Sequence, residues 1–544
     1  MQLKALLAFL AVSLHMGLAQ AHQHSDASSA PPPTHLGIVS FEISCSPQVT
    51  PDFNRAVALL HSFWHEQAKA TFEKVAAAEP ECAMAYWGEA LTDFHQILDL
   101  PSPADIAAGQ RALAMADGAH EKSPREAAYI QALHAFYDGY EEKDYYVHAQ
   151  RYAQAMEKLV AVYPTDVEGK VFYALSLLAA DADDDVTLVN SRKAVAVLAP
   201  LLQQHPDHPG IAHYMIHACD NPQMARLGLS AARRYASVAP AAPHALHMPA
   251  HIYARLGLWQ DDIQSNLVSK AASERTTGAH IGAENRLHAM EFLEYAYLQT
   301  GQDERARALV EEGRTIEQAD LDPTFAGYFS TVEARFAALY TIETQDWNSA
   351  ARLQPIPQGG RFSLGLTLLA HAMAAGHRHD AQAGREAAET FNQHLEGVQL
   401  PPGVAIPTVR DEIQAWSDYA EGHLEEALTL LRSIADRQDK FGKEEVDLPA
   451  REMLAKMLQL EHRPTEAFRE YQASLRSDPN RFNTLLGAAQ TAEELRHHSL
   501  AVRYYRQLLA NCRSASGVAI KQLAHARAVV AGSPSRREGV ESAF

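Results

Sequence analysis

The sequence predicts an all-α protein, an α-solenoid of roughly ten helix-turn-helix repeats with a concave groove. Two observations support this fold class. Apolar residues recur with helical spacing almost throughout the chain, and no stretch shows the alternation that is typical of a strand. Short turns that contain Gly, Pro or Asp, such as EHRPTEA and QTGQDERA, separate the helical stretches.

The chain divides into four predicted parts. Residues 1–21 are expected to form a secretory signal peptide, because a short positive start precedes an apolar run and a small-residue cleavage box. Residues 22–50 form a polar linker and N-terminal segment, and residues 51–510 form the solenoid. Residues 511–544 complete the last helix and end in a solvated tail. No cysteine directly follows the apolar run, so we expect a periplasmic or secreted protein without a lipid anchor.

One pattern of side chains recurs along the predicted solenoid. A small residue is followed four positions later by an apolar residue and twelve positions later by a proline. The small residue lets two helices pack closely, and the proline ends the second helix. The clearest examples are Ala68, Phe72 and Pro80; Ala194, Leu198 and Pro206; and Ala467, Tyr471 and Pro479.

This pattern resembles the second helix of a tetratricopeptide repeat (TPR). The whole chain also resembles a group of exported bacterial TPR proteins, through the stretches AMAYWG, HMPAHI and PNRFN. The resemblance implies a TPR-like fold and an exported location, and it implies no particular activity. It also implies which positions of each first helix line the concave groove.

Composition narrows the classes of partner. The 544 residues carry a formal net charge of −20, and no basic stripe interrupts the acidic balance. Nucleic acid and anionic membranes are bound by basic patches on proteins, so neither is an expected partner. No stretch after the N-terminal region is apolar enough to span a membrane.

The cysteines and one aromatic cluster give further expectations. In an exported protein Cys45 and Cys82 could form a disulfide that ties the N-terminal segment to the first repeat, whereas Cys219 and Cys512 are expected to be buried thiols. The cluster of His61, Phe63, Trp64, Tyr86 and Trp87 is expected to pack in the core between repeats.

Histidines concentrate on two stretches, HYMIHACD and PHALHMPAHIYARLG. On ideal helices His213, His217 and Asp220 form one stripe, and His244, His247, His251 and Arg255 form another. The TPR resemblance places both stripes in the groove, together with His288, Glu291 and Tyr295 on the next repeat. Pro249 should kink its helix or begin a shorter one, and Asp262 stands where the repeat expects a small residue.

Histidine pairs four residues apart on neighbouring helices can bind a transition metal, and copper or zinc is the expected ion. The sequence therefore predicts that at least three of His213, His217, His244, His247 and His251 bind one ion, with His288 or Asp220 completing the site. Such a protein could be a metal-dependent enzyme or a metal carrier. Asp220, Arg255, Glu291 and Tyr295 are available for proton transfer, but their spacing dictates no reaction. The alternative is a metal-free scaffold whose groove binds a peptide or protein.

Overall fold

A computed structural model describes residues 34–97, 100–120, 122–141, 145–181, 187–276, 279–316, 326–357, 359–398, 405–443 and 446–533. The predicted signal peptide and the end of the predicted tail lie outside these residues. The described residues form helices joined by short connections, and they contain no β-strand. None of its helices is long and apolar enough to cross a membrane.

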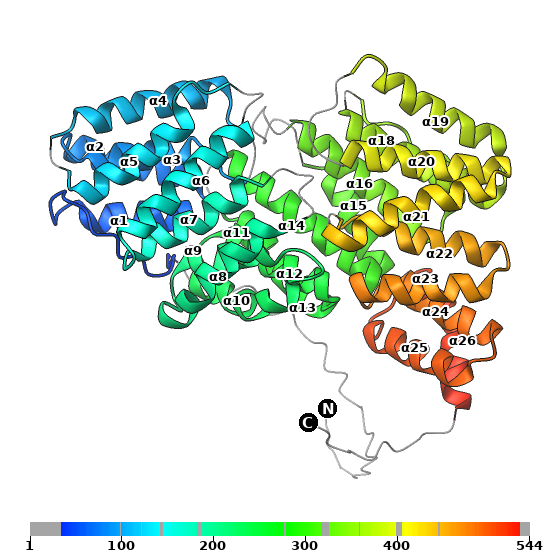
Figure 1. Ribbon diagram of the computed structural model, residues 1–544. Helices are drawn as coiled ribbons and strands as arrows, with labels where there is room; N and C mark the ends of the chain where they lie inside the picture. Colours follow the sequence, from blue (N-terminus) through cyan, green and yellow to red (C-terminus); the bar gives the residue numbers. More distant parts are fainter. Residues whose placement is uncertain are drawn as a thin grey trace, which may run out of the picture. The chain divides into compact units, whose positions relative to one another are not determined.

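Successive helices pack against each other in hairpins, as Figure 1 shows. The N-terminal helices are α1 (Thr50–His61), α2 (His65–Ala78), α3 (Ala83–Thr92), α4 (Pro103–Gly118), α5 (Pro124–Tyr137), α6 (Tyr145–Val162), α7 (Val167–Ala179) and α8 (Val189–Gln204). The middle of the chain forms α9 (Pro209–Cys219), α10 (Ala225–Val238), α11 (Pro243–His247), α12 (Pro249–Leu256), α13 (Trp259–Ser273), α14 (Ala279–Gln299), α15 (Asp303–Gly313), α16 (Ala326–Glu343) and α17 (Trp347–Ala350). The C-terminal helices are α18 (Arg361–Arg378), α19 (Ala381–Leu395), α20 (Ala405–Glu421), α21 (Leu424–Phe441), α22 (Ala450–Leu460), α23 (Pro464–Ser477), α24 (Phe482–Glu494), α25 (His498–Asn511) and α26 (Ala519–Gly532).

The repeat pattern has the predicted packing role. Ala68, Ala194 and Ala467 are each fully buried, so they allow close contact between paired helices. Gly88 lies so close to the ring of Phe72 that a β-carbon would clash with it. The prediction of an all-α, TPR-like solenoid is confirmed. Its C-terminal end extends further than expected, because α26 continues the stack past residue 510 and packs on α25.

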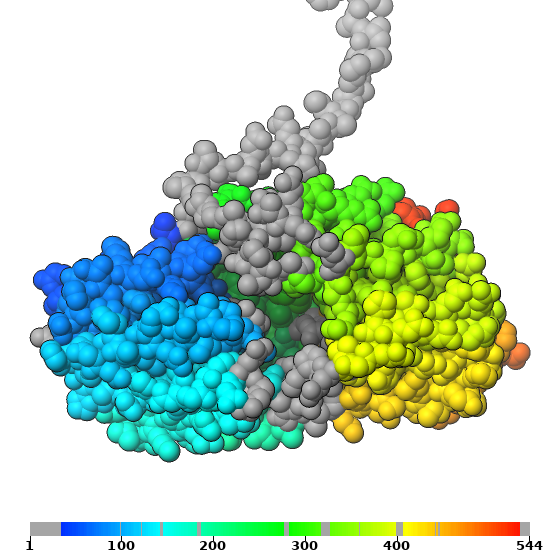
Figure 2. Space-filling model, turned by 90° about the horizontal axis from the view of Figure 1, so that it is seen from above, coloured from blue at the N-terminus to red at the C-terminus, as the bar shows by residue number. Residues whose placement is uncertain are grey.

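Two hydrophobic cores run along the stack and meet in the middle of the chain. The first extends from Leu36 to Tyr253, and the second from Ala250 to Ala526. Both cores therefore include residues of α12. In the space-filling view the surface is hollowed between the blue and yellow helices, with green residues from the middle of the chain at its floor (Figure 2).

The C-terminal repeats return to contact α12 and α13. The indole nitrogen of Trp259 donates to the Asn480 carbonyl oxygen at 2.9 Å, and the Asn480 side chain donates to the Gly257 carbonyl oxygen at 3.1 Å. Gly257 has a φ of +62°, and a β-carbon there would collide with the Pro479 carbonyl. This position therefore requires glycine. The contact joins the turn at Gly257 to the PNRFN stretch.

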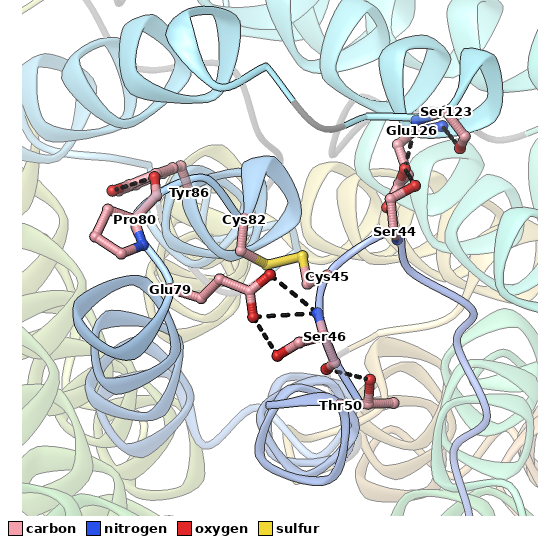
Figure 3. Close-up of a disulfide and its surroundings, with 10 residues drawn as sticks. All are labelled: Ser44, Cys45, Ser46, Thr50, Glu79, Pro80, Cys82, Tyr86, Ser123 and Glu126. Atoms are coloured by element: carbon pink, nitrogen blue, oxygen red, sulfur yellow. Dashed lines mark hydrogen bonds between the residues drawn. A yellow bond between two sulfur atoms is a disulfide. The ribbon is translucent and has the colours of Figure 1, made fainter. Parts of the chain in front are cut away.

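The N-terminal segment is tied to the first repeat, as predicted. Cys45 and Cys82 form a disulfide with their Cα atoms 5.2 Å apart (Figure 3). Beside it, the Glu79 carboxylate accepts a hydrogen bond from the Ser46 backbone at 2.9 Å. Residues after Thr34 are not a free linker, because Phe41 is buried among aromatic rings. Cys219 and Cys512 are buried thiols, and burial raises the pKa of each to about 12.

Replacing both Cys45 and Cys82 with serine should loosen the first repeat. The disulfide closes a stretch with a sequence separation of 37, and opening such a loop costs about 3–4 kcal/mol in the chain-entropy description. Hydrogen exchange of peptides from residues 34–92 should therefore become faster in the double variant. Reductant should have the same effect on the native protein and none on the variant, and unchanged exchange in the variant would contradict this role.

Candidate metal centre

The six predicted histidines lie in two groups of three. The N-terminal triad consists of His213, His217 and His244, and the C-terminal triad consists of His247, His251 and His288. Within each triad one ring nitrogen from every histidine lies within 4.8 Å of the other two. The sequence predicted one shared site, and the structure instead divides these histidines between two neighbouring groups.

Local helix geometry produces this division. His213 and His217 are one turn apart on α9, so their rings lie side by side. Pro249 begins α12, and His244 and His247 lie on the separate short helix α11. Because proline cannot donate a backbone hydrogen bond, the chain breaks between the two helices. His244 then faces α9, whereas His247 faces His251 and the α14 residue His288.

Hydrogen bonds fix the protonation of two rings in the C-terminal triad. The Nδ1 atom of His251 lies 2.8 Å from a carboxylate oxygen of Asp220, so it must carry the proton. The Nδ1 atom of His247 lies 2.6 Å from Oδ1 of Asn266. The Asn266 amide nitrogen donates to Oδ1 of Asp262 at 2.7 Å, which leaves its oxygen to accept from His247.

Two lone pairs therefore face each other. With Nδ1 protonated, the Nε2 atom of each neutral ring is an acceptor, yet Nε2 of His247 lies only 3.0 Å from Nε2 of His251. A cation must lie at this point, either a proton on one ring or a metal ion shared by both. Burial lowers the pKa of His247 well below its usual range, and the neighbouring His288 and His251 lower it further. The buried setting thus disfavours a proton on His247.

His288 supplies the third ring of the C-terminal triad. Its centroid lies 4.3 Å from that of His247. Its Nδ1 atom lies 3.1 Å from the Tyr328 hydroxyl and 3.4 Å from the Glu291 carboxylate. Arg335 in turn pairs with Glu291 at 2.5 Å. All three rings of this triad therefore have a partner at Nδ1, which is how proteins orient metal-binding imidazoles.

The N-terminal triad has one fixed ring. His213 is fully buried and donates from Nδ1 to the His61 carbonyl oxygen at 2.6 Å. Its Nε2 atom is therefore an acceptor, and it faces Nε2 of His217 at 3.0 Å and Nε2 of His244 at 3.2 Å. Burial lowers the pKa of both His213 and His244 well below the usual range, and other histidines nearby add to the effect.

Each triad packs against one phenylalanine. The Phe63 ring lies 4.3–5.6 Å from the three rings of the N-terminal triad, measured between centroids. The Phe292 ring lies 4.7–5.5 Å from the three rings of the C-terminal triad. Phe63 is partly buried against the N-terminal core that contains Trp87, as expected, and it also contacts the histidines. These rings restrict the imidazoles and keep the surroundings apolar.

The predicted acidic and basic residues lie behind the rings. Asp220 accepts from His251 and also from Arg255 at 2.9 Å, so it orients a ring rather than lying among the ring nitrogens. The Tyr295 hydroxyl, assigned to the groove by sequence, donates to the Asp447 carbonyl and contacts Arg481. Each of the groups considered for proton transfer thus has a structural partner.

The sequence pattern identified Asp262 as unusual, but Asn266 was not predicted to belong to the site. Both are fully buried, and together they orient His247. Burial raises the pKa of Asp262 well above its usual range, which favours the neutral form of its carboxyl group. The signal was present, because Asn266 stands four residues after Asp262, where the repeat pattern has an apolar side chain.

A third group, His61, Glu168 and His208, is fully buried and differs in its hydrogen bonding. Each histidine donates from Nε2 to one Glu168 oxygen at 2.9 Å. Their Nδ1 atoms can accept from the Tyr214 hydroxyl and the Ile211 backbone. Donors and acceptors match throughout, so this network needs no metal ion.

Comparisons with known proteins identify no family. The chain matches no family model and no curated protein. Similar solved structures include the human IFIT1 dimer with PPP-AAAA, at 12% identity and a TM-score of 0.34, covering 84% of this chain and 89% of that chain. The Cut9–Hcn1 structure of the APC/C aligns at 12% identity and a TM-score of 0.32, covering 88% and 90%. The structure of Naa15/Naa10 bound to HypK-THB aligns at 13% identity and a TM-score of 0.24, covering 90% and 81%. At these scores the likeness carries no inference about a site or an activity.

Acid should destabilise the metal-free protein below about pH 6.5. Because His213, His244 and His247 have lowered pKa values in the folded state, the unfolded chain binds more protons once the pH falls below the ordinary imidazole value of about 6.5. Their stabilisation is therefore present above that pH and is lost as the pH falls, by about 1.4 kcal/mol per pH unit for each buried neutral ring.

Urea denaturation of EDTA-treated protein at pH 7.5, 6.5 and 5.5 tests this dependence. The unfolding free energy should fall between the last two values, and His247→Gln should reduce the slope because glutamine does not titrate. A flat profile in the native sequence would contradict the assignment of neutral buried rings.

Proposed function

We propose that this protein binds a transition-metal ion through His247, His251 and His288, on a TPR-like helical scaffold. The observation that carries the proposal is the 3.0 Å contact between two Nε2 atoms that are both acceptors. A metal ion bonded to both nitrogens turns this repulsion into attraction, and it is compatible with the lowered pKa of the buried His247 ring.

The donor set is compatible with copper or zinc. Three imidazoles and no carboxylate face the centre of the triad, and imidazole suits Zn, Cu, Ni and Fe. His247 is 1% exposed, whereas the His288 side chain is 33% exposed. The site therefore has a buried side that holds the rings and an open side through which an ion could enter. Three protein ligands leave a position for a small molecule or a donor from a partner, which suits either a catalyst or a carrier.

Export also belongs to the proposal. The signal peptide predicted from sequence would deliver the protein to an oxidising compartment, where a disulfide such as Cys45–Cys82 persists. Copper and zinc sites made of histidine remain functional there because imidazole, unlike a thiolate, does not form disulfides.

A peptide-binding scaffold is the alternative function. The hollow in the space-filling view favours it, because helical repeats use such surfaces to hold extended partners (Figure 2). In that case the histidines would be polar contacts for the partner, and the protein would hold no metal.

Elemental analysis of purified protein distinguishes the two. We expect bound copper or zinc in the native protein, and its loss from the C-terminal triad in the His247→Ala/His251→Ala variant. Metal at a hundred times its dissociation constant should stabilise the folded state by about 2.7 kcal/mol. Because burial lowers the pKa of His247, release on acidification should begin below pH 6.5.

Two controls keep the test specific. His497→Ala/His498→Ala replaces an exposed pair far from the triads in sequence and should change neither metal content nor stabilisation. Asp220→Ala leaves all three ligands in place and should weaken binding about 10–100-fold, because His251 loses its orienting partner. If the native protein holds no metal, or the His247/His251 variant keeps all of it, the peptide-binding alternative is favoured.

A further inference from the structure

We infer that the N-terminal triad holds a second metal ion of its own, so that one chain carries two ions side by side. The inference rests on the proposed function for the chemistry of the first ion, but its own evidence comes from other residues. His213, His217 and His244 offer three ring nitrogens within 4.8 Å of one another. None of them belongs to the C-terminal triad.

The hydrogen bonding of His213 is the first argument. Its Nδ1 proton is committed to the His61 carbonyl oxygen, so its Nε2 atom has one lone pair in the ring plane. That lone pair faces two other ring nitrogens, at 3.0 Å and 3.2 Å. If His217 or His244 donated a hydrogen bond to this nitrogen, its single lone pair would be occupied. The remaining ring nitrogen would then face it with no hydrogen bond to form. A metal ion at the centre accepts all three lone pairs.

The surroundings of the two triads are the second argument. Each triad has one ring that is at most 1% exposed, His213 or His247, with its Nδ1 atom bonded to a fixed oxygen. Each triad also has two rings that are more exposed and one phenylalanine in contact with all three rings. The third histidine group lacks this arrangement, because Glu168 and internal donors satisfy it completely.

The two triads are adjacent. The rings of His217 and His251 lie 6.3 Å apart between centroids, and so do those of His244 and His247. Two divalent ions this close repel each other, and the six ligands are neutral. The repulsion between two monovalent ions would be four times weaker, because the charge product falls from four to one. The pair therefore suits monovalent ions such as copper(I), or divalent ions such as copper(II) with an anion between them.

Copper(II) added to EDTA-treated full-length protein, followed by removal of unbound ions, tests the inference. The native chain should retain two copper ions. His217→Ala/His244→Ala should retain one, and so should His247→Ala/His251→Ala, whereas the quadruple variant should retain none. In electron paramagnetic resonance the signal of the native protein should be broadened or lost through coupling to the neighbouring ion, and each double variant should give the sharper spectrum of an isolated ion.

The outcomes separate this inference from the proposed function. One ion in the native chain, lost in either double variant, would mean a single shared site and would overturn the second ion while leaving metal binding intact. Retention of two ions by His217→Ala/His244→Ala would overturn it as well. Absence of copper from the native chain would overturn both. If the double variant loses helix content, His217→Gln keeps the size and polarity of the side chain and should still remove one ion.

Discussion

The candidate site depends on which nitrogen of each imidazole carries the proton. A neutral histidine has one donor and one acceptor, so a partner at Nδ1 decides the character of Nε2. Here the Nδ1 atoms of three rings donate hydrogen bonds to oxygen atoms. The acceptors are the Asp220 carboxylate, the Asn266 side chain and the His61 carbonyl. The Nε2 atoms of these rings then converge on other ring nitrogens. Two unprotonated ring nitrogens at hydrogen-bond distance repel each other, and a cation between them removes this repulsion.

The scaffold imposes this arrangement through departures from its own repeat. Asp262 and Asn266 occupy positions that hold small and apolar side chains elsewhere, and their polar groups are aligned with His247. Polar groups buried in a helix interface cost stability unless they are hydrogen-bonded. Here the hydrogen bonds of Asn266 to His247 and Asp262 offset part of that cost, and the same bonds orient the His247 ring. Pro249 is a second departure, since it separates α11 from α12 and directs His244 and His247 to different triads.

The site also lies where the two hydrophobic cores meet, and later repeats support it. Arg255, which holds Asp220, donates to the Lys443 carbonyl oxygen at 2.6 Å. Trp259 and Gly257, just beyond it, contact residues 479–480. The orientation of His251 is thus connected to residues almost two hundred positions away. A change in the C-terminal repeats can therefore alter the orientation of His251 without touching either triad.

Much of the fold could be predicted from the sequence, because the offsets of Ala68, Phe72 and Pro80 recur and each has a direct packing cause. The disulfide could be predicted too, since Cys45 and Cys82 border the first repeat. Helical angles and repeat register also selected the six histidines. They could not divide them, because the division depends on a break at Pro249 and on which rings touch across helices. The sequence did not predict the roles of Phe63, Phe292 and the His61 carbonyl for the same reason, because their contacts join segments far apart in sequence.

Anomalous X-ray diffraction from crystals of the metal-loaded protein tests the central claim most directly. Data collected on both sides of the copper or zinc absorption edge locate the ion without assumptions about its ligands. The account predicts an anomalous peak about 2 Å from Nε2 of both His247 and His251, on the side that faces His288. Ordered rings in their present orientation with no peak between them would contradict it, because a proton would then be the cation that these two nitrogens share.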